Sequence, residues 1–526
     1  MNKNSMLFLV FSAMTLLVYY YFAAPKPNPE QNQPGQTQTV QTQTAQSAAN
    51  AAESVSIIKE SDGGFVQEET INIETARYRA TLSNRGAAVI QWSIKERNGE
   101  WVDLVLPGAA PMMANFPGAN YKIVSKSNEK VVFEYASAQG WKITKTYTLS
   151  QDSFMHNLNI ALARTKEEVK LPNIELDWGP GLGTDAKEMK ENTSVTRIIA
   201  FTATKPGKLK VLKKEPEPFG LFRWAAIDNR YFLAAFIPEK SIDFDQITPS
   251  RQSKKHPFSL HINAITPADN ASKDYSVDFY IGPKGFTFLR TFNIGLESAV
   301  DFSMFGFLGK WALAVLSYFY KITHNYGWAI IMLTIIIQII VMPLSLKSYK
   351  AMAAMKRVQP MIKEIQDKFK GDPKRLQAEM LNIYKTQKVN PLGGCLPMIL
   401  QLPIFWAFFS MLRNAYELRN EPWILWVKDL SAPDQFMDLG FLTINLLPLI
   451  MGLGMFLQQK MTAVSSDPMQ RRIMYLMPII FTFLFWTFPS GLVLYWLTNS
   501  VFSMGLQYFV LKKDKERVQL SGVNRA

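Results

Sequence analysis

Cysteine and histidine are scarce in this chain of 526 residues. The single cysteine, Cys395, excludes an intramolecular disulfide framework and any zinc or iron–sulfur site built from several cysteines. The four histidines are too few and too scattered along the sequence for a dense metal cluster. The phosphate-binding pattern G-x-x-x-x-G-K-[ST] is also absent, so nucleotide hydrolysis is not implied. We therefore expect no metal ion, no other cofactor and no enzymatic activity.

Charged residues are few and unevenly placed. They make up 19% of the chain, against roughly 25% in an average soluble domain. A membrane-spanning helix needs about 20 apolar residues, and several stretches of that length hold no Asp, Glu, Lys, Arg or His. The last stretch is too long for one span and contains the turn signal Pro489-Ser490-Gly491, so it predicts two helices. The stretches, which together predict six spans, are 4–25, 325–346, 389–412, 439–459 and 473–511.

The first stretch predicts an uncleaved transmembrane anchor at residues 1–25. A cleavable signal peptide is the alternative, but Met6–Phe22 is longer than the usual apolar region of about 7–15 residues, and no clear A-x-A site follows it. Residues 26–53 are rich in Pro, Gln, Thr, Asn and Ala and have almost no large apolar side chain. Such a segment cannot bury enough surface to offset its ordering entropy, which predicts a flexible linker.

Basic residues gather in one loop and in the C-terminal tail. Residues 347–388 carry eleven Lys or Arg and four acids, whereas residues 413–438 carry three basic residues and five acids. Cytoplasmic loops of membrane proteins have an excess of Lys and Arg. The loop 347–388 and the basic tail 512–526 are therefore predicted to be cytoplasmic. The long segment after the first span is predicted to lie on the outer side.

Residues 54–300 alternate between apolar and polar side chains, as in Trp141–Tyr147 and Asp274–Tyr280. Runs of period two that are broken at short spacing by Gly, Pro and Asn predict a large all-β sandwich domain. The local sequence shows no carboxylate pair or His/Asp pattern that is typical of an active site. A folded scaffold is therefore favoured over a sugar-binding or sugar-modifying domain.

Two further segments predict amphipathic helices. Residues 301–324 contain Lys310 and Lys321 with only ten residues between them, which favours an interfacial helix at the outer membrane surface over a span. Packing on the sandwich is the alternative. Residues 347–388 predict a cytoplasmic hairpin of two helices, separated at Gly371-Asp372-Pro373. Its methionines suit a surface that meets varied apolar partners, and simple packing explains them equally well.

Several motifs in the C-terminal half are more specific. They are Met342–Leu344, Asn390–Pro397, Gln401–Phe405, Asp467–Gln470 with Met477-Pro478, and Phe488–Trp496. With them, the region from about Phe302 to Leu511 resembles the YidC family of membrane-protein insertases. Outside it, Leu82–Gly86 and Tyr280–Lys284 are similar to the periplasmic domain of Gram-negative members. With the resemblance, the predicted fold class is a polytopic α-helical membrane protein with six spans, of which the resemblance implies a five-helix insertase core, and a large all-β periplasmic sandwich domain.

The resemblance implies a multi-pass protein of the bacterial inner membrane, with the large domain in the periplasm and the C-terminus in the cytoplasm. It implies an insertase and chaperone that moves nascent hydrophobic segments into the membrane through a hydrophilic groove, alone or with the Sec translocon. Groove positions would be Thr334 and Gln338 on the second span, although members commonly carry arginine where this chain has Gln338. Substrate-contact positions would be Gln401, Pro403 and Phe405 on the third span and Tyr495 and Trp496 on the last.

The residues support a groove independently of the resemblance. Residues 389–511 hold the predicted spans three to six. Thr334 and Gln338 are four residues apart and share a helix face. A second polar stripe lies on the last span and consists of Asn499, Ser503 and Gln507. Polar side chains in lipid usually face a protein interior or a wet cavity. Interhelical hydrogen bonds are the alternative explanation for both stripes.

The charge pattern bears on rival functions and on partners. No ionisable residue lies within the six predicted spans, which disfavours a polytopic transporter. A membrane-tethered sugar-binding or sugar-modifying protein is the other alternative. The expected partners are nascent membrane proteins, the Sec translocon and membrane lipids. The ribosome is a further expected partner, through the basic tail and the basic loop that includes Lys356 and Arg357. DNA is not expected as a partner.

Overall fold

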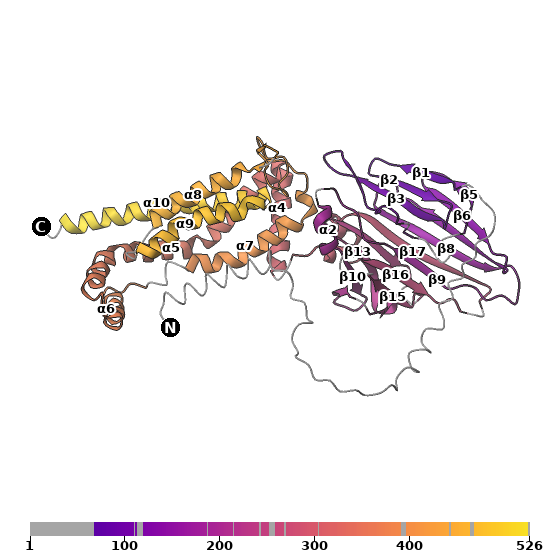
Figure 1. Cartoon of the computed structure of the whole chain (residues 1–526), viewed down its shortest axis with the longest axis horizontal. Helices are drawn as coiled ribbons and strands as arrows, with labels where there is room; N and C mark the ends of the chain where they lie inside the picture. Colours follow the sequence, from indigo (N-terminus) through magenta and orange to yellow (C-terminus); the bar gives the residue numbers. More distant parts are fainter. Residues whose placement is uncertain are drawn as a thin grey trace, which may run out of the picture. The chain divides into compact units, whose positions relative to one another are not determined.

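The computed structural model describes most of the chain from residue 68 onward (Figure 1). The predicted anchor 1–25 and linker 26–53 lie outside the described residues. All described residues belong to one compact unit, Lys59–Ala526. The described ranges are 68–109, 111–112, 119–186, 188–213, 215–240, 243–251, 258–267, 270–302, 305–390, 396–440, 443–462 and 468–523.

The first part of the described chain is β-rich and antiparallel (indigo to magenta in Figure 1). A nine-stranded sheet has the order β11-β10-β13-β14-β17-β8-β7-β6-β5, and two four-stranded sheets have the orders β1-β2-β3-β4 and β12-β15-β16-β9. The strands are β1 (Thr70–Glu74), β2 (Tyr78–Ser83), β3 (Ala88–Lys95), β4 (Trp101–Asp103), β5 (Lys122–Lys126), β6 (Lys130–Ala136), β7 (Trp141–Thr148), β8 (Met155–Arg164), β9 (Ile174–Trp178), β10 (Arg197–Thr202), β11 (Leu209–Leu212), β12 (Glu217–Pro218), β13 (Phe222–Asp228), β14 (Phe232–Pro238), β15 (Gln246–Ser250), β16 (Ser259–Ala264) and β17 (Ser272–Pro283).

Both four-stranded sheets pack on one face of the nine-stranded sheet. The ring centroid of Trp92 in β3 lies 6.2 Å from that of Phe279 in β17, and Trp178 in β9 lies 6.3 Å from Phe236 in β14. Phe236 and Phe279 are direct cross-strand partners, so their side chains share a face. Strand β8 alternates between half-buried and buried residues, as expected of a strand with one face in the core. The segment whose sequence alternates between apolar and polar residues thus forms a β-rich domain.

One segment quoted for the family resemblance, Leu82–Gly86, ends at a glycine whose carbonyl binds a buried lysine. The Nζ of Lys145 donates to the carbonyl oxygen of Gly86 at 2.7 Å, and Gly86 has a φ of 67°, which favours glycine. The Tyr147 hydroxyl donates to the neighbouring carbonyl of Ala87 at 2.8 Å. Burial lowers the pKa of Lys145 to about 7, because the interior disfavours the charged form. The segment is therefore a buried structural turn.

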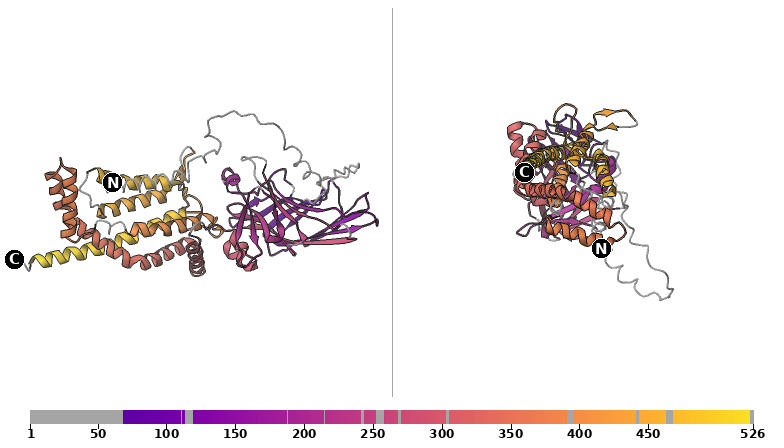
Figure 2. Two further views of the ribbon diagram at one scale, coloured as in Figure 1. Left: turned by 90° about the horizontal axis from the view of Figure 1, so that it is seen from below. Right: turned by 90° about the vertical axis from the view of Figure 1, so that its left-hand side faces the viewer.

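The chain from Gly306 onward is mainly helical (Figures 1 and 2). Helix α10 contacts α5, α7 and α8, while α4 contacts α5 and α7, and α8 contacts α9. The longer helices are α4 (Gly306–Thr323), α5 (Tyr326–Lys368), α6 (Pro373–Thr386), α7 (Leu396–Asn414), α8 (Leu446–Thr462), α9 (Pro468–Leu484) and α10 (Ser490–Val523). The shorter elements are α2 (Met189–Val195), α3 (Phe286–Leu289), the 3₁₀ helices η1 (Phe219–Leu221), η3 (Arg290–Phe292), η4 (Leu296–Ala299), η5 (Tyr416–Leu418) and η6 (Phe485–Thr487), and the hairpin of β18 (Met437–Asp438) and β19 (Thr443–Ile444).

Helix α5 continues without a break past residue 346, where the sequence placed the end of the second span. Its first turn is capped by Asn325, whose side chain accepts hydrogen bonds from the backbone N–H groups of Gly327 and Trp328. Helix α6 begins at Pro373 and is capped in the same way by Asp372. The Gly-Asp-Pro sequence thus ends one helical segment and starts the next.

Among the described residues, α5 is the one helix that is both long and apolar enough to cross a membrane, and Met474–Thr487 forms a shorter apolar stretch. The observed architecture is therefore a β-rich domain followed by a helical C-terminal region that includes a membrane-spanning candidate.

Candidate functional site

Helix α5 carries a row of buried polar side chains. Thr334, Gln338, Ser345 and Ser348 are each 5% exposed or less. Their spacing returns to one side of a helix with 3.6 residues per turn. The Thr334 hydroxyl donates to the carbonyl of Ile330 at 2.7 Å, so it is satisfied within its own helix. Thr334 and Gln338 were predicted from the sequence, and the two serines extend the same row towards the hairpin.

Helix α10 carries a second row, and it packs against α5. Ser503 and Gln507 are buried, whereas Asn499 is half-buried. Tyr349 of α5 shares a hydrogen bond with Ser503. We call these two rows the polar seam. Its members are Thr334, Gln338, Ser345 and Ser348 on α5 and Asn499, Ser503 and Gln507 on α10.

Two oxygen atoms of the polar seam are buried without a hydrogen-bond partner in the structure, Asn499 Oδ1 and Gln507 Oε1. Leaving a buried acceptor unpaired costs about 1–3 kcal/mol, and a water molecule or a polar chain that donates to it removes that cost. Hydrogen bonding between helices explains the Tyr349–Ser503 contact. It does not explain these two oxygens.

The predicted substrate-contact residues come together where α7 meets α10. The side-chain amide of Gln401 donates to the Tyr495 hydroxyl, and the Tyr495 ring stacks on Phe408 with a centroid distance of 4.6 Å. The Phe405 ring meets the Trp496 ring edge-on at 5.4 Å. Tyr495 is fully buried. It therefore packs between α7 and α10 and has no exposed surface that a substrate could contact.

Phe405 and Trp496 are half-buried and belong to a wider aromatic cluster. Phe405 also lies 6.2 Å from Phe485, and Trp496 lies 5.8 Å from Phe481, between ring centroids. Pro403 lies within α7, where it removes one backbone hydrogen-bond donor. The arrangement offers a broad apolar face made by α7, α9 and α10.

The predicted cytoplasmic hairpin packs through a small core of its own. Val358 and Ile362 of α5 are buried against Ile383 of α6 and Val389, with Met355 and Met380 partly buried around them. Met361 is 41% exposed, and both Lys356 and Arg357 are exposed. Packing therefore accounts for part of the methionine stripe, while Met361 remains on the surface.

The loop that follows α7 holds a cluster that sequence analysis missed. Arg419 forms ion pairs with Glu96, Asp185 and Glu188 at 2.6, 2.7 and 2.9 Å. The side chains of Arg419 and Glu96 are only 4% and 2% exposed. Burial opposes the charge of Arg419, but the carboxylates of Glu188 and Glu96 outweigh it and raise its pKa above the usual value. Arg419 therefore ties the loop to the β-rich domain.

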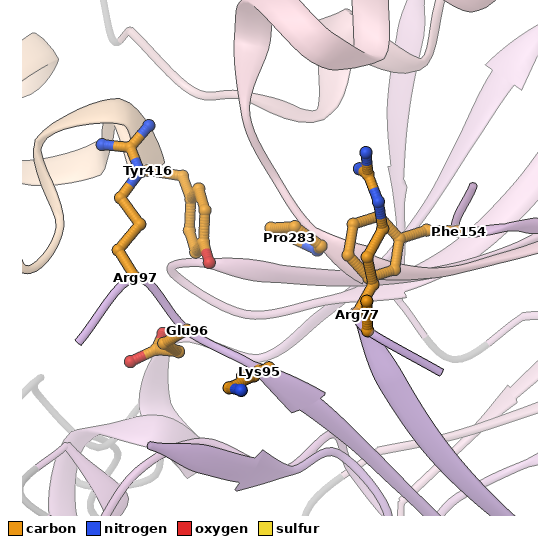
Figure 3. Close-up of a pocket in the computed structure, with 8 residues that line it drawn as sticks. Arg77, Lys95, Glu96, Arg97, Phe154, Pro283 and Tyr416 are labelled. Carbon is orange, nitrogen blue, oxygen red and sulfur yellow. The ribbon is translucent and has the colours of Figure 1, made fainter. Parts of the chain in front are cut away.

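A pocket of about 320 Å³ lies beside this cluster (Figure 3). Its lining includes the basic residues Arg77, Lys95 and Arg97 as well as Glu96. Arg97 itself forms an ion pair with Glu421 of the same loop. None of the predicted groove or substrate-contact residues lines this pocket.

Comparison with known proteins matches both parts of the chain. Residues 318–517 match the family model described as 60Kd inner membrane protein, and residues 111–315 match the YidC periplasmic domain. The chain is 61% identical over 515 residues to the membrane protein insertase YidC of Endomicrobium trichonymphae, which covers 98% of this chain and 99% of that protein. It is 34% identical to the YidC of Syntrophus aciditrophicus, over 98% of this chain and all of that protein.

A crystal structure of an active YidC insertase with its first transmembrane domain resolved covers 84% of this chain and 93% of its own, at 19% identity and a TM-score of 0.39. The sequence relationships span almost the whole length of both relatives. The resemblance first read from the motifs is thereby confirmed, and the chain belongs to the YidC family of membrane protein insertases.

Proposed function

We propose that this protein is a membrane-protein insertase and chaperone of the bacterial inner membrane. The family relationship supports this function over a transporter or a sugar-modifying protein. The observation that carries the mechanism is the polar seam, because it places unpaired oxygen atoms inside an otherwise apolar group of helices. Nascent membrane proteins are the substrates.

The mechanism is physical. A hydrophobic segment docks on the hairpin of α5 and α6 and leaves along the apolar face formed by α7, α9 and α10. Its polar flank crosses beside the polar seam, which acts as the wall of a hydrophilic groove. A charged side chain at the bilayer centre costs about 2.5–3.5 kcal/mol on insertion scales. A hydrated groove wall shortens the distance over which the polar flank must cross hydrocarbon. Burial of the apolar segment in lipid provides the free energy for insertion.

The topology we propose has six spans, five of which form the insertase core. The β-rich domain lies in the periplasm, and the C-terminus and the hairpin lie in the cytoplasm. Helix α4 fits an interfacial position, since it packs on α5 and α7 and leaves one apolar side exposed. The exposed apolar residues of α4 are Phe307, Trp311, Tyr318 and Ile322.

Two partners are proposed beyond the substrate. The Sec translocon would act beside the insertase on larger substrates. The ribosome would contact the basic hairpin, on which Lys356 and Arg357 are exposed, and the basic tail. The same basic residues would also attract acidic lipid headgroups, at about 1 kcal/mol for each Lys or Arg near the surface.

The proposal is tested by replacing polar side chains of the polar seam with apolar ones. Cells depleted of the protein receive either the wild type or the triple variant Asn499→Leu, Ser503→Leu, Gln507→Leu, and insertion of a small membrane protein with a charged periplasmic tail is followed by protease accessibility. We expect insertion to fall about tenfold or more, because the tail then meets nearly the full hydrocarbon penalty. A neutral-tailed substrate should lose much less.

A matched control changes the opposite side of the same helix. Val501, Tyr508 and Phe509 of α10 are exposed, and their replacement by Leu keeps an apolar lipid-facing surface. This control should insert both substrates normally. Equal insertion of the charged-tail substrate by the seam variant, present at wild-type level, would rule out the hydrophilic-groove mechanism.

A further inference from the structure

The outer face of one four-stranded sheet carries a group of metal-binding side chains. In strand β9, Ile174, Leu176 and Trp178 are buried, whereas Glu175 and Asp177 between them are half-buried. Strand β16 shows the same alternation, with His261 and Asn263 on the half-buried side. Side chains of alternate residues in a strand lie on the same face. The four polar residues therefore share the face that points away from the core.

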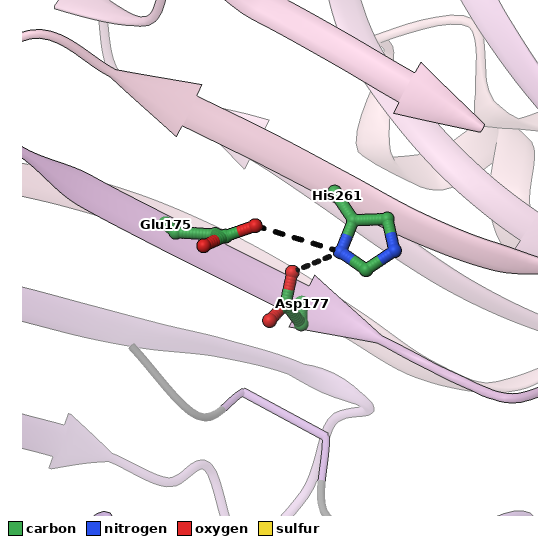
Figure 4. A group of neighbouring side chains, drawn as sticks. All are labelled: Glu175, Asp177 and His261. Carbon is green, nitrogen blue, oxygen red and sulfur yellow. Dashed lines mark hydrogen bonds and ion pairs between the residues drawn. The ribbon is translucent and has the colours of Figure 1, made fainter. Parts of the chain in front are cut away.

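The strand register brings these side chains together. His261 is the cross-strand partner of Asp177, and Asn263 is the partner of Glu175. The His261 Nδ1 atom lies 2.6 Å from Asp177 Oδ1 and 3.7 Å from Glu175 Oε1 (Figure 4). One ligand atom from each of Glu175, Asp177 and His261 lies within 4.8 Å of the other two. Two carboxylates thus converge on one imidazole nitrogen.

These separations suit a tetrahedral metal ion. Zinc binds histidine nitrogen and carboxylate oxygen at about 2.0–2.2 Å, which places neighbouring ligand atoms about 3.4 Å apart. The separations of 2.6 and 3.7 Å lie on either side of that value. A side-chain rotation that moves Asp177 Oδ1 about 1 Å away from His261 Nδ1 would open the space for the ion.

The far side of the imidazole is already held. The hydroxyl of Ser250, on the neighbouring strand β15, lies 2.9 Å from His261 Nε2. In metal sites the second ring nitrogen of a ligating histidine usually donates to such a partner, which fixes the ring and its tautomer. Ser250 can accept from Nε2–H and leave the Nδ1 lone pair directed at the two carboxylates.

A fourth oxygen lies on the same face. Asn263 Oδ1 is buried and has no hydrogen-bond partner in the structure. Its backbone is opposite Glu175, two residues from His261. Amide oxygens are accepted ligands of divalent cations.

We propose that Glu175, Asp177 and His261 form a binding site for a first-row divalent metal ion, with Zn²⁺ as the best fit to one imidazole and two carboxylates. Asn263 Oδ1 or a water molecule supplies the fourth ligand. The ion would link β9 to β16 and stiffen this sheet. This site was not predicted from the sequence, because His261 lies 84 residues from Asp177 and the two carboxylates are separated by one residue in an ordinary strand pattern.

The test uses the full-length protein without a histidine tag, purified in detergent and stripped with a chelator. Calorimetric titration with ZnCl₂ should give one site per chain, and Co²⁺ should give the visible absorption bands of a tetrahedral site. His261→Gln and Asp177→Asn should each weaken Zn²⁺ binding at least tenfold, and Ser250→Ala about tenfold through loss of ring orientation.

His324→Asn is the matched control, because it removes an imidazole elsewhere while asparagine tolerates the positive φ of 51° at that position. This variant should bind Zn²⁺ as the wild type does. Thermal unfolding without metal verifies that each variant is folded. The proposal is overturned if the wild type binds no Zn²⁺ at 100-fold molar excess, or if folded His261→Gln and Asp177→Asn bind it with wild-type affinity.

Discussion

At the scale of single residues, the β-rich domain contains an uncharged histidine in an aromatic environment. His156 is 3% exposed and lies 5.0 Å from the ring centroids of both Tyr78 and Trp92. Its Nδ1 accepts a hydrogen bond from the backbone N–H of Ser150 at 3.1 Å. Burial lowers the pKa of His156 from 6.5 to about 3. The folded protein therefore holds this imidazole neutral where an unfolded chain would protonate it.

This difference makes stability depend on pH. Between pH 6.5 and about 3 the unfolded chain binds a proton at His156 that the folded protein does not, so the free energy of unfolding falls as the pH falls. We expect His156 alone to contribute a loss of about 2–3 kcal/mol between pH 7.5 and 4.5. Thermal unfolding of the full-length protein should therefore show a weaker pH dependence in His156→Gln than in the wild type. Parallel curves for wild type and His156→Gln would contradict this account.

The Arg419 cluster supports a second prediction. Replacing Arg419 by Met leaves Glu96 buried without its cation, which should cost about 3–5 kcal/mol. Lys126→Met breaks an ion pair with Glu69 in which both side chains are more than half exposed, at 63% and 54%, and should cost less than about 1 kcal/mol. Limited proteolysis and thermal unfolding measure both effects. Adding Glu96→Gln to Arg419→Met should recover part of the loss, and no recovery would show that burial of the Glu96 charge is not the cause.

At the scale of secondary-structure elements, α7 and α10 present aromatic side chains that suit contact with a sliding apolar segment. A photo-crosslinker in place of Phe405 should capture a stalled nascent membrane protein, because Phe405 is half-buried at the apolar face of α7. Val124, 53% exposed on β5 of the β-rich domain, is the control position and should capture far less. Equal capture at both positions would count against a path along α7.

Elements were more predictable than the contacts between them. Charge-free stretches and period-two alternation indicated the helical region and the β-rich domain, because those patterns follow from burial of one strand face or a whole helix. Thr334 and Gln338 were named from the family resemblance, and their spacing of four residues supported a shared helix face. Ser345 and Ser348 were missed, since small hydroxyl residues occur in many apolar helices. The partners of Arg419 lie more than 230 residues away in the sequence, so no local pattern indicated them.

At the scale of the whole molecule, the topology is open to direct measurement. Single cysteines in a Cys395→Ser background should react oppositely with a membrane-impermeant thiol reagent on intact cells whose outer membrane is permeabilised. Leu425 is 84% exposed in the loop after α7 and should label, whereas the exposed Lys374 of the hairpin should label only after lysis. Labelling at position 374 from outside would contradict the six-span topology.

The length of α5 has a mechanical consequence. Its 43 residues form one rod about 64 Å long, from the capped end at Asn325 to the tip of the hairpin. A straight helix transmits a displacement of one end to the other, except where its backbone hydrogen bonds are interrupted. Pro343 and Pro360 interrupt them on the hairpin side of Thr334 and Gln338. Beyond Pro343, Tyr349 still ties α5 to Ser503 of α10, so a bend at Pro360 would turn the end of the hairpin while the polar seam keeps its place.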